Sequence, residues 1–115
     1  MKHKIFASAL LAFSTIVFAS SPAIAAGVDA DAAQKLAKKN NCFKCHAIDK
    51  TKKGPAYKRV AARLKTKPDG VDVIVEHITS GRMVELEDGT REKHKIVDTA
   101  DPAELRNLAR WILSL

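Results

Sequence analysis

The sequence predicts an all-α protein of about four helices joined by substantial loops. Apolar residues recur at helical spacing in four stretches, and capping residues bound several of them. One stretch, VDVIVEHITSG, is rich in β-branched residues and could be a strand, but its apolar residues also keep helical spacing. We therefore interpret it as a helix. No internal repeat or low-complexity tract indicates another architecture.

The first helix is predicted to run from an acidic cap through Asn40. Asp29 or Asp31 can accept hydrogen bonds from the free N–H groups of its first turn. Its apolar face consists of Ala33, Leu36 and Ala37.

Two further helices are predicted after a loop over residues 42–55, which ends in Gly54-Pro55. The second helix covers residues 57–64, where the apolar spacing is kept by Tyr57, Val60, Ala61 and Leu64. The sequence Pro-Asp-Gly at 68–70 then breaks the chain. The third helix is expected to close at Gly81, and its apolar residues are Val71, Ile74, Val75 and Ile78.

The last helix has the clearest signals, and the polar residues 82–100 before it are expected to be irregular. Asp101 is the predicted N-cap, Pro102 takes the first helical position, and Glu104 suits a capping box. The buried stripe is formed by Leu105, Leu108, Ala109 and Ile112.

The start of the chain has the pattern of a secretory signal peptide, predicted for residues 1–25. Basic residues precede an apolar run from Ile5 to Ala19, and Ala23-Ile24-Ala25 forms an A-x-A cleavage site. A membrane anchor is the alternative, but a cleavage site follows the run directly. We expect cleavage after Ala25, with Ala26 as a neighbouring option. Residues 26–115 then form one domain in the periplasm, with no transmembrane segment after cleavage.

Both cysteines lie in Cys42-Phe43-Lys44-Cys45-His46, a C-x-x-C-H motif that is typical of covalent haem attachment. Two thiols about one turn apart can form thioether bonds to the two haem vinyl groups, and the adjacent histidine can offer a nitrogen to the iron. Three alternatives use the same residues: a redox disulfide, a zinc site and a structural disulfide. Haem attachment is favoured because βαβ patterning is absent, zinc ligands are rarely adjacent, and a disulfide here would close a tiny loop.

Over essentially all of residues 26–115 the chain resembles the short bacterial class I c-type cytochromes. The resemblance rests on NCFKCHAIDKTKKGPAYKRVAARL and on the terminal LRNLARWILSL. It implies the small cytochrome c fold, with first and last helices packed together around one covalently bound haem c. It further implies that Cys42 and Cys45 carry the haem, that His46 is the proximal iron ligand, that the Pro55 carbonyl holds its imidazole, and that Trp111 packs near the haem.

The chain departs from this family at the distal face of the iron. The family supplies a methionine from a loop before the last helix, but the corresponding LEDGTREKHKIVDT contains none. His94 stands seventeen residues before Trp111, where the family places its distal ligand, whereas Met83 stands twenty-eight before it. We therefore predict His94 as the distal ligand, with Met83 as the alternative. His77 is interpreted as a helix-surface residue.

The charge distribution is strongly asymmetric. Between Lys35 and Lys67 there are twelve Lys or Arg residues and one acid, whereas from Pro68 onward acids outnumber bases. The basic half can steer the protein toward redox partners with an acidic docking surface, or it can simply keep the protein soluble. A membrane-associated oxidoreductase is a further candidate partner. Nucleic acid is not expected, because the chain is exported and lacks interleaved aromatic residues.

These observations predict a periplasmic one-electron carrier with histidine on both sides of its iron, and no enzymatic activity of its own. Two strong protein ligands leave no open iron position for a substrate. The alternatives are a haem sensor or gas-binding protein with a labile sixth ligand, a haem subunit of a periplasmic oxidoreductase complex, a catalytic haem protein using His77 and Glu76, or a haem-free module.

Overall fold

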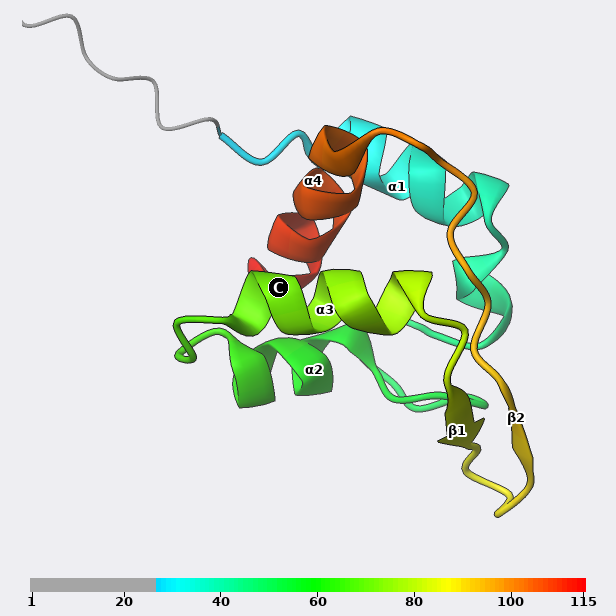
Figure 1. Ribbon diagram of the computed structural model, residues 1–115. Helices are drawn as coiled ribbons and strands as arrows, with labels where there is room; N and C mark the ends of the chain where they lie inside the picture. Colours follow the sequence, from blue (N-terminus) through cyan, green and yellow to red (C-terminus); the bar gives the residue numbers. More distant parts are fainter. Residues whose placement is uncertain (1–26) are drawn as a thin grey trace, which may run out of the picture.

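The computed structural model describes residues 27–115, which form four α-helices, one 3-10 turn and one short hairpin (Figure 1). The predicted signal peptide, residues 1–25, and the optional cut at Ala26 lie outside the described residues. Between Gly27 and Leu115, no helix is both long and apolar enough to cross a bilayer. The all-α class predicted from the sequence is confirmed.

The C-terminal helix α4 (Pro102–Leu113) organises the fold, because it packs against each of the other three helices. These are α1 (Ala30–Lys39), α2 (Tyr57–Leu64) and α3 (Gly70–Thr79). Leu108 and Ala109 are almost inaccessible to solvent, and Trp111 and Ile112 complete the buried side of α4. The first and last helices therefore meet, and a hydrogen bond from the Asp29 N–H to Asn107 Oδ1 at 2.9 Å joins them.

The N-caps of α1 and α4 follow the sequence signals, with one exception. Asp29, rather than Asp31, caps α1 by accepting the Ala32 N–H at 2.9 Å. Asp101 caps α4 by accepting the Ala103 N–H at 2.8 Å. The predicted capping box is wrong in its second half, because the Thr99 hydroxyl intervenes. It accepts the Asp101 N–H at 3.1 Å and donates to Glu104, so Glu104 does not reach the cap itself.

The β-branched stretch is a helix, as predicted. α3 buries Ile74 and Ile78 on the side that faces α4, and Val71 and Val75 are partly buried. Gly81 adopts a positive φ of 62° just beyond the last residues of the helix, where a left-handed conformation ends a helix at little cost to glycine.

A short hairpin, unlike the irregular segment that we predicted, follows α3. Strands β1 (Met83–Glu85) and β2 (Arg91–Lys93) pair antiparallel with Val84 opposite Glu92. Gly89 supplies a positive φ of 82° in the turn between them. Each strand has three residues that are mostly exposed, so the sequence has no run of alternating apolar residues to reveal them. The Glu87 N–H, in the turn of this hairpin, donates to the Lys53 carbonyl at 3.1 Å, so the hairpin lies beside the loop that follows the cysteines (Figure 1).

Candidate haem-binding site

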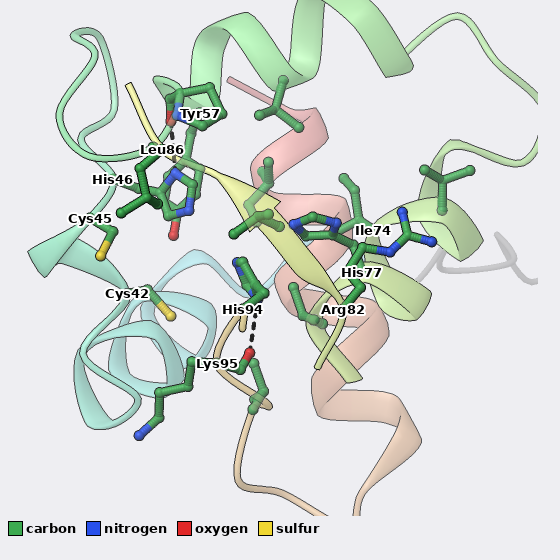
Figure 2. Close-up of a pocket in the computed structure, with 18 of the residues that line it drawn as sticks. Cys42, Cys45, His46, Tyr57, Ile74, His77, Arg82, Leu86, His94 and Lys95 are labelled. Atoms are coloured by element: carbon green, nitrogen blue, oxygen red, sulfur yellow. Dashed lines mark hydrogen bonds between the residues drawn. The ribbon is translucent and has the colours of Figure 1, made fainter. Parts of the chain in front are cut away.

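A cavity of about 540 Å³ lies between the cysteine-bearing segment, the helices and the hairpin. Its size falls in the range of about 300–1,000 Å³ that is usual for ligand and cofactor pockets. Helices α2, α3 and α4 line it with apolar side chains, namely Val60, Leu64, Ile74, Ile78, Leu108 and Ile112. Cys42 and Cys45 lie on one side of this cavity, and His77 and Arg82 lie on the opposite side (Figure 2). The cavity can therefore hold a large apolar group beside two thiols.

The cysteines are held by one tight turn. Residues Cys42–Lys44 form a 3-10 turn, and the Cys42 carbonyl accepts the N–H groups of Cys45 at 3.1 Å and His46 at 3.0 Å. This folding brings the two thiols to the same cavity and leaves both free and partly buried. Burial raises the pKa of the Cys42 thiol above its ordinary value. Both thiols are thus free to form covalent bonds to a group in the cavity.

His46 projects into the cavity in a fixed orientation. Its Nδ1–H donates to the Pro55 carbonyl at 2.7 Å, and its ring stacks on Tyr57 with ring centres 5.0 Å apart. Burial lowers the pKa of His46, and the Pro55 hydrogen bond opposes that shift. With Nδ1 engaged, Nε2 carries the free lone pair. A hydrogen bond of this kind fixes both tautomer and ring angle in histidines that ligate metals.

Trp111 stands behind this arrangement and does not line the cavity. Its ring packs edge-on against Tyr57 with centres 5.7 Å apart, and against Phe43 at 6.4 Å. It is 3% exposed and belongs to the core. Trp111 therefore supports the ring on which His46 stacks.

Gly54 is a site residue that sequence reasoning missed. A Cβ at this position would lie 2.7 Å from Cε1 of His46 and 3.1 Å from Nδ1. The Gly54 N–H also donates to the Cys45 carbonyl at 2.8 Å. The backbone passes directly against the imidazole, so only glycine fits. The sequence showed this glycine merely as part of a loop end.

Replacing Gly54 by alanine should displace the His46 ring. The ring cannot yield freely, since the Pro55 carbonyl and Tyr57 hold it on two sides. We expect the free energy of unfolding to fall by about 1–3 kcal/mol, the usual cost of overpacking. Chemical denaturation of the holoprotein measures it. Gly27→Ala is the matched control, because nothing lies within 4 Å of its added Cβ. Equal stabilities of the two variants would contradict this account of Gly54.

His94 enters the cavity from the loop after β2, facing His46. The centres of the two rings are 6.2 Å apart. The Nδ1–H of His94 donates to the Lys95 carbonyl at 2.9 Å, as Figure 2 shows, so Nε2 is again the free nitrogen. Imidazole nitrogens bind metals at about 2.0–2.1 Å, so two rings on opposite sides of one metal atom have centres roughly 6 Å apart. The observed separation fits that requirement.

The two other candidates also reach the cavity wall. Met83 belongs to β1, lines the cavity and leaves 47% of its surface exposed. His77 lines the cavity from α3, with its ring centre 4.4 Å from that of His94. Burial lowers the pKa of His77 to about 4. Our interpretation of His77 as a helix-surface residue is therefore wrong, because its half-buried ring lines the cavity beside His94.

A protein-only metal site lacks support in the described chain. From residue 27 to residue 115, no three His, Cys, Asp or Glu side chains converge on one point as metal ligands. The zinc interpretation of Cys42, Cys45 and His46 therefore has no complete set of protein donors.

Comparisons with known proteins agree with this geometry. The profile of the Cytochrome c family matches residues 30–115. Cytochrome c-552 of Nitrosomonas europaea is 37% identical over 98 residues, covering 85% of this chain and 91% of that protein. Cytochrome c-551 of Pseudomonas aeruginosa is 30% identical over 98 residues, covering 85% and 90%. The crystal structure of the class 1 cytochrome MtoD from Sideroxydans lithotrophicus ES-1 aligns with a TM-score of 0.73 at 48% identity, covering 76% of this chain and 97% of that one.

The fold and the cavity thus define a class I c-type cytochrome, and the chain belongs to the cytochrome c family. It carries one covalently bound haem c and acts as an electron-transfer protein with redox partners. The resemblance drawn from the C-x-x-C-H motif and the last helix is confirmed at the level of family, fold and cofactor.

Proposed function

We propose that this cytochrome is a periplasmic one-electron carrier in which Cys42 and Cys45 hold the haem and His46 and His94 ligate its iron. The observation that carries the proposal is the 6.2 Å separation of the two imidazole rings across the cavity. The haem supplies reversible one-electron chemistry at its iron. The chain's part is to fix two nitrogen ligands, exclude water and present one edge of the site to a partner.

The proximal assignment is supported by the way the chain holds His46. The hydrogen bond to Pro55, the stacking on Tyr57 and the close backbone of Gly54 together leave the ring one orientation. His46 follows Cys45 directly in the chain and lines the same cavity as both cysteines, so it would be available to ligate the iron of a haem held by the two thiols. A ligand that is already oriented loses little freedom on binding.

The distal assignment is supported by orientation as well as distance. Nδ1 of His94 is occupied by the Lys95 carbonyl, and its backbone N–H donates to the Arg82 carbonyl at 2.8 Å. Hydrogen bonds thus hold both the ring and the main chain of His94 in one orientation. Met83 also lines the cavity, but it stays 47% exposed. Imidazole is a good ligand for iron, and two imidazoles give a lower potential than a histidine–methionine pair.

Optical spectra of the purified holoprotein test this proposal. Bis-histidine ligation should give a low-spin ferric protein without the weak far-red band that accompanies methionine–iron bonding. The reduced protein should show sharp α and β bands that carbon monoxide leaves unchanged. A methionine band would assign the distal site to Met83. Ready binding of carbon monoxide would instead support the sensor alternative.

The basic loop around the haem motif is proposed as the docking surface for acidic redox partners. Lys44, Lys50 and Lys53 are exposed. Lys52 is also exposed, but its ammonium group donates to the Phe43 carbonyl at 2.5 Å. Among residues 27–115 the ion pairs are Glu76–Arg82 and Asp72–Arg106, so no ion pair in this part of the chain neutralises the loop.

Charge reversal at this loop should slow association with the native partner. In Lys44→Glu/Lys53→Glu we expect the association rate at low salt to fall about tenfold, with the intrinsic transfer rate unchanged. The same change at Lys65 and Lys67, exposed beyond the end of α2, is the matched control and should have a small effect. Stopped-flow measurements over a range of salt concentrations separate the two rates. Equal responses of both variants would leave the loop with a role in solubility alone.

The proposed compartment follows from residues 1–25, with their basic start, apolar run and A-x-A site. Cell fractionation, together with N-terminal sequencing of the mature protein, tests it. We expect a periplasmic product that begins at Ala26 or Gly27.

A further inference from the structure

Asn40, at the C-terminal end of α1, is the single buried polar residue among residues 27–115 and is 2% exposed. Its Nδ2–H donates to the Leu36 carbonyl at 3.0 Å, and its Oδ1 accepts the Asp98 N–H at 2.7 Å. A buried amide is costly unless its donor and acceptor are both satisfied. The second bond joins residues 58 positions apart, so it fastens two distant parts of the chain.

Asp98 belongs to the segment that carries His94 into the cavity. Residues 94–98 have no regular secondary structure, and Lys95 and Ile96 are exposed. Three of their backbone N–H groups donate to other parts of the chain. The Arg82 carbonyl accepts the His94 N–H at 2.8 Å, the Ile78 carbonyl accepts the Val97 N–H at 2.9 Å, and Asn40 accepts the Asp98 N–H.

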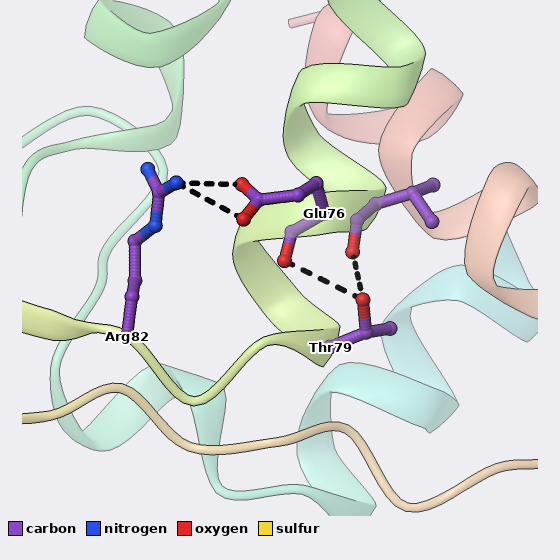
Figure 3. A network of polar contacts seen from close by, with 4 residues as sticks. Glu76, Thr79 and Arg82 are labelled. Carbon is purple, nitrogen blue, oxygen red and sulfur yellow. Dashed lines mark hydrogen bonds and ion pairs between the residues drawn. The ribbon is translucent and has the colours of Figure 1, made fainter.

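Two of these anchors come from the end of α3 and the residues after it. Arg82 is itself tethered, because its guanidinium pairs with Glu76 of α3 at 2.9 Å (Figure 3). Asn40 is the anchor that comes from the other side of the cavity. It lies two residues before Cys42, so it links the segment bearing the thiols directly to the segment bearing His94.

We infer that Asn40 is a positioning residue that keeps His94 on the iron and sets how often the distal imidazole leaves it. This inference rests on the proposed ligation by His94. With the Asp98 bond in place, the segment can move away only by breaking a hydrogen bond to the buried amide of Asn40. Without it, the bonds at His94 and Val97 remain, but the segment is no longer fastened to the thiol-bearing side of the chain, and the ligand can swing out with less disruption.

The test is the rate at which imidazole or cyanide replaces the distal ligand of the ferric holoprotein. That rate is limited by departure of the protein's own ligand. Asn40→Ala and Asn40→Ser both lose the bond to Asp98. A serine at this position can still bond to the Leu36 carbonyl one turn earlier, so that variant spares the end of α1. We expect both variants to exchange about tenfold faster, the factor that one lost hydrogen bond typically gives.

Leu36→Ala is the matched control. It removes a buried side chain from the same helix and lowers stability, but it leaves the backbone carbonyl and the Asp98 bond in place. Its exchange rate should stay near that of the parent. Equal acceleration in Leu36→Ala, or unchanged exchange in both Asn40 variants, would overturn the inference. The parent spectrum is recorded first, so loss of the bis-histidine assignment would be seen there, before any Asn40 variant is compared, and would overturn both proposals.

Discussion

Replacing His94 by alanine should convert the ferric protein from low to high spin and let the ferrous protein bind carbon monoxide stoichiometrically. The reason is geometric, because the His94 ring lies 6.2 Å from the His46 ring and its Nδ1 is already bonded to the Lys95 carbonyl, which leaves Nε2 for the proposed ligation. Removal of the ring leaves one iron position to water or a small ligand. Absorption spectra with and without carbon monoxide measure the change, which runs from no binding to full binding.

Two control variants make the result specific. Met83→Leu should leave the spectra unchanged, because its side chain is not required at the iron. His77 lies close enough to His94 to enter a vacated position, so the double variant His94→Ala/His77→Ala is compared with His94→Ala alone. Carbon monoxide binding in Met83→Leu, with none in the double variant, would assign the distal site to Met83.

The helices could be predicted because their signals are local. Asp29 and Asp101 cap the helices that they precede, and the buried residues of α4 lie where the apolar spacing places them. In VDVIVEHITSG the apolar spacing predicts the helix correctly although the β-branched composition favours a strand, and Ile74 and Ile78 both face the core. Capping hydrogen bonds within one turn and burial on one helix face both depend on residues that are close together in the sequence.

The hairpin and the second half of the capping box could not be predicted in the same way. Strands of three mostly exposed residues are too short to carry a clear alternating pattern, and their pairing depends on a turn at Gly89 rather than on burial. In the capping box, the Glu104 carboxylate accepts from the Thr99 hydroxyl, just before the cap, instead of from the Asp101 N–H. A motif predicts its partner only when no nearer group takes the same hydrogen bond.

For the site, the sequence indicated which residues meet but not what holds them. The position of His94 along the chain predicts it as a site residue, and the structure places its ring 6.2 Å from that of His46. Gly54 and Asn40 were not found, because their roles depend on contacts that residue type does not reveal. A glycine in a loop has many uses, and Asn40 bonds to a backbone N–H 58 residues away. The interpretation of His77 is wrong because helical spacing cannot show that a loop residue later in the chain, His94, lies against this helix.

The largest effect of all is expected from the cysteines. In Cys42→Ala/Cys45→Ala no thiol remains to add across the haem vinyl groups, since the chain has two cysteines in all. Each single variant keeps one thiol and should keep one thioether bond. The denatured parent should retain the mass of one haem through acid–acetone extraction, each single variant should retain it in lower yield, and the double variant should lose it completely. Mass spectrometry of the extracted chains gives an all-or-none answer.

Covalent attachment also matters for stability, because the core of this domain is small and the cavity is lined by residues of three helices. A cofactor bound without a covalent link stabilises the fold only in proportion to its free concentration relative to its dissociation constant. The double variant should therefore unfold more readily on dilution, whereas the parent should be indifferent to dilution. His94→Ala is the control, because it opens the iron but leaves both thiols, and it should retain the haem mass in full. Complete retention of haem in the double variant would show that the two cysteines are not the points of attachment.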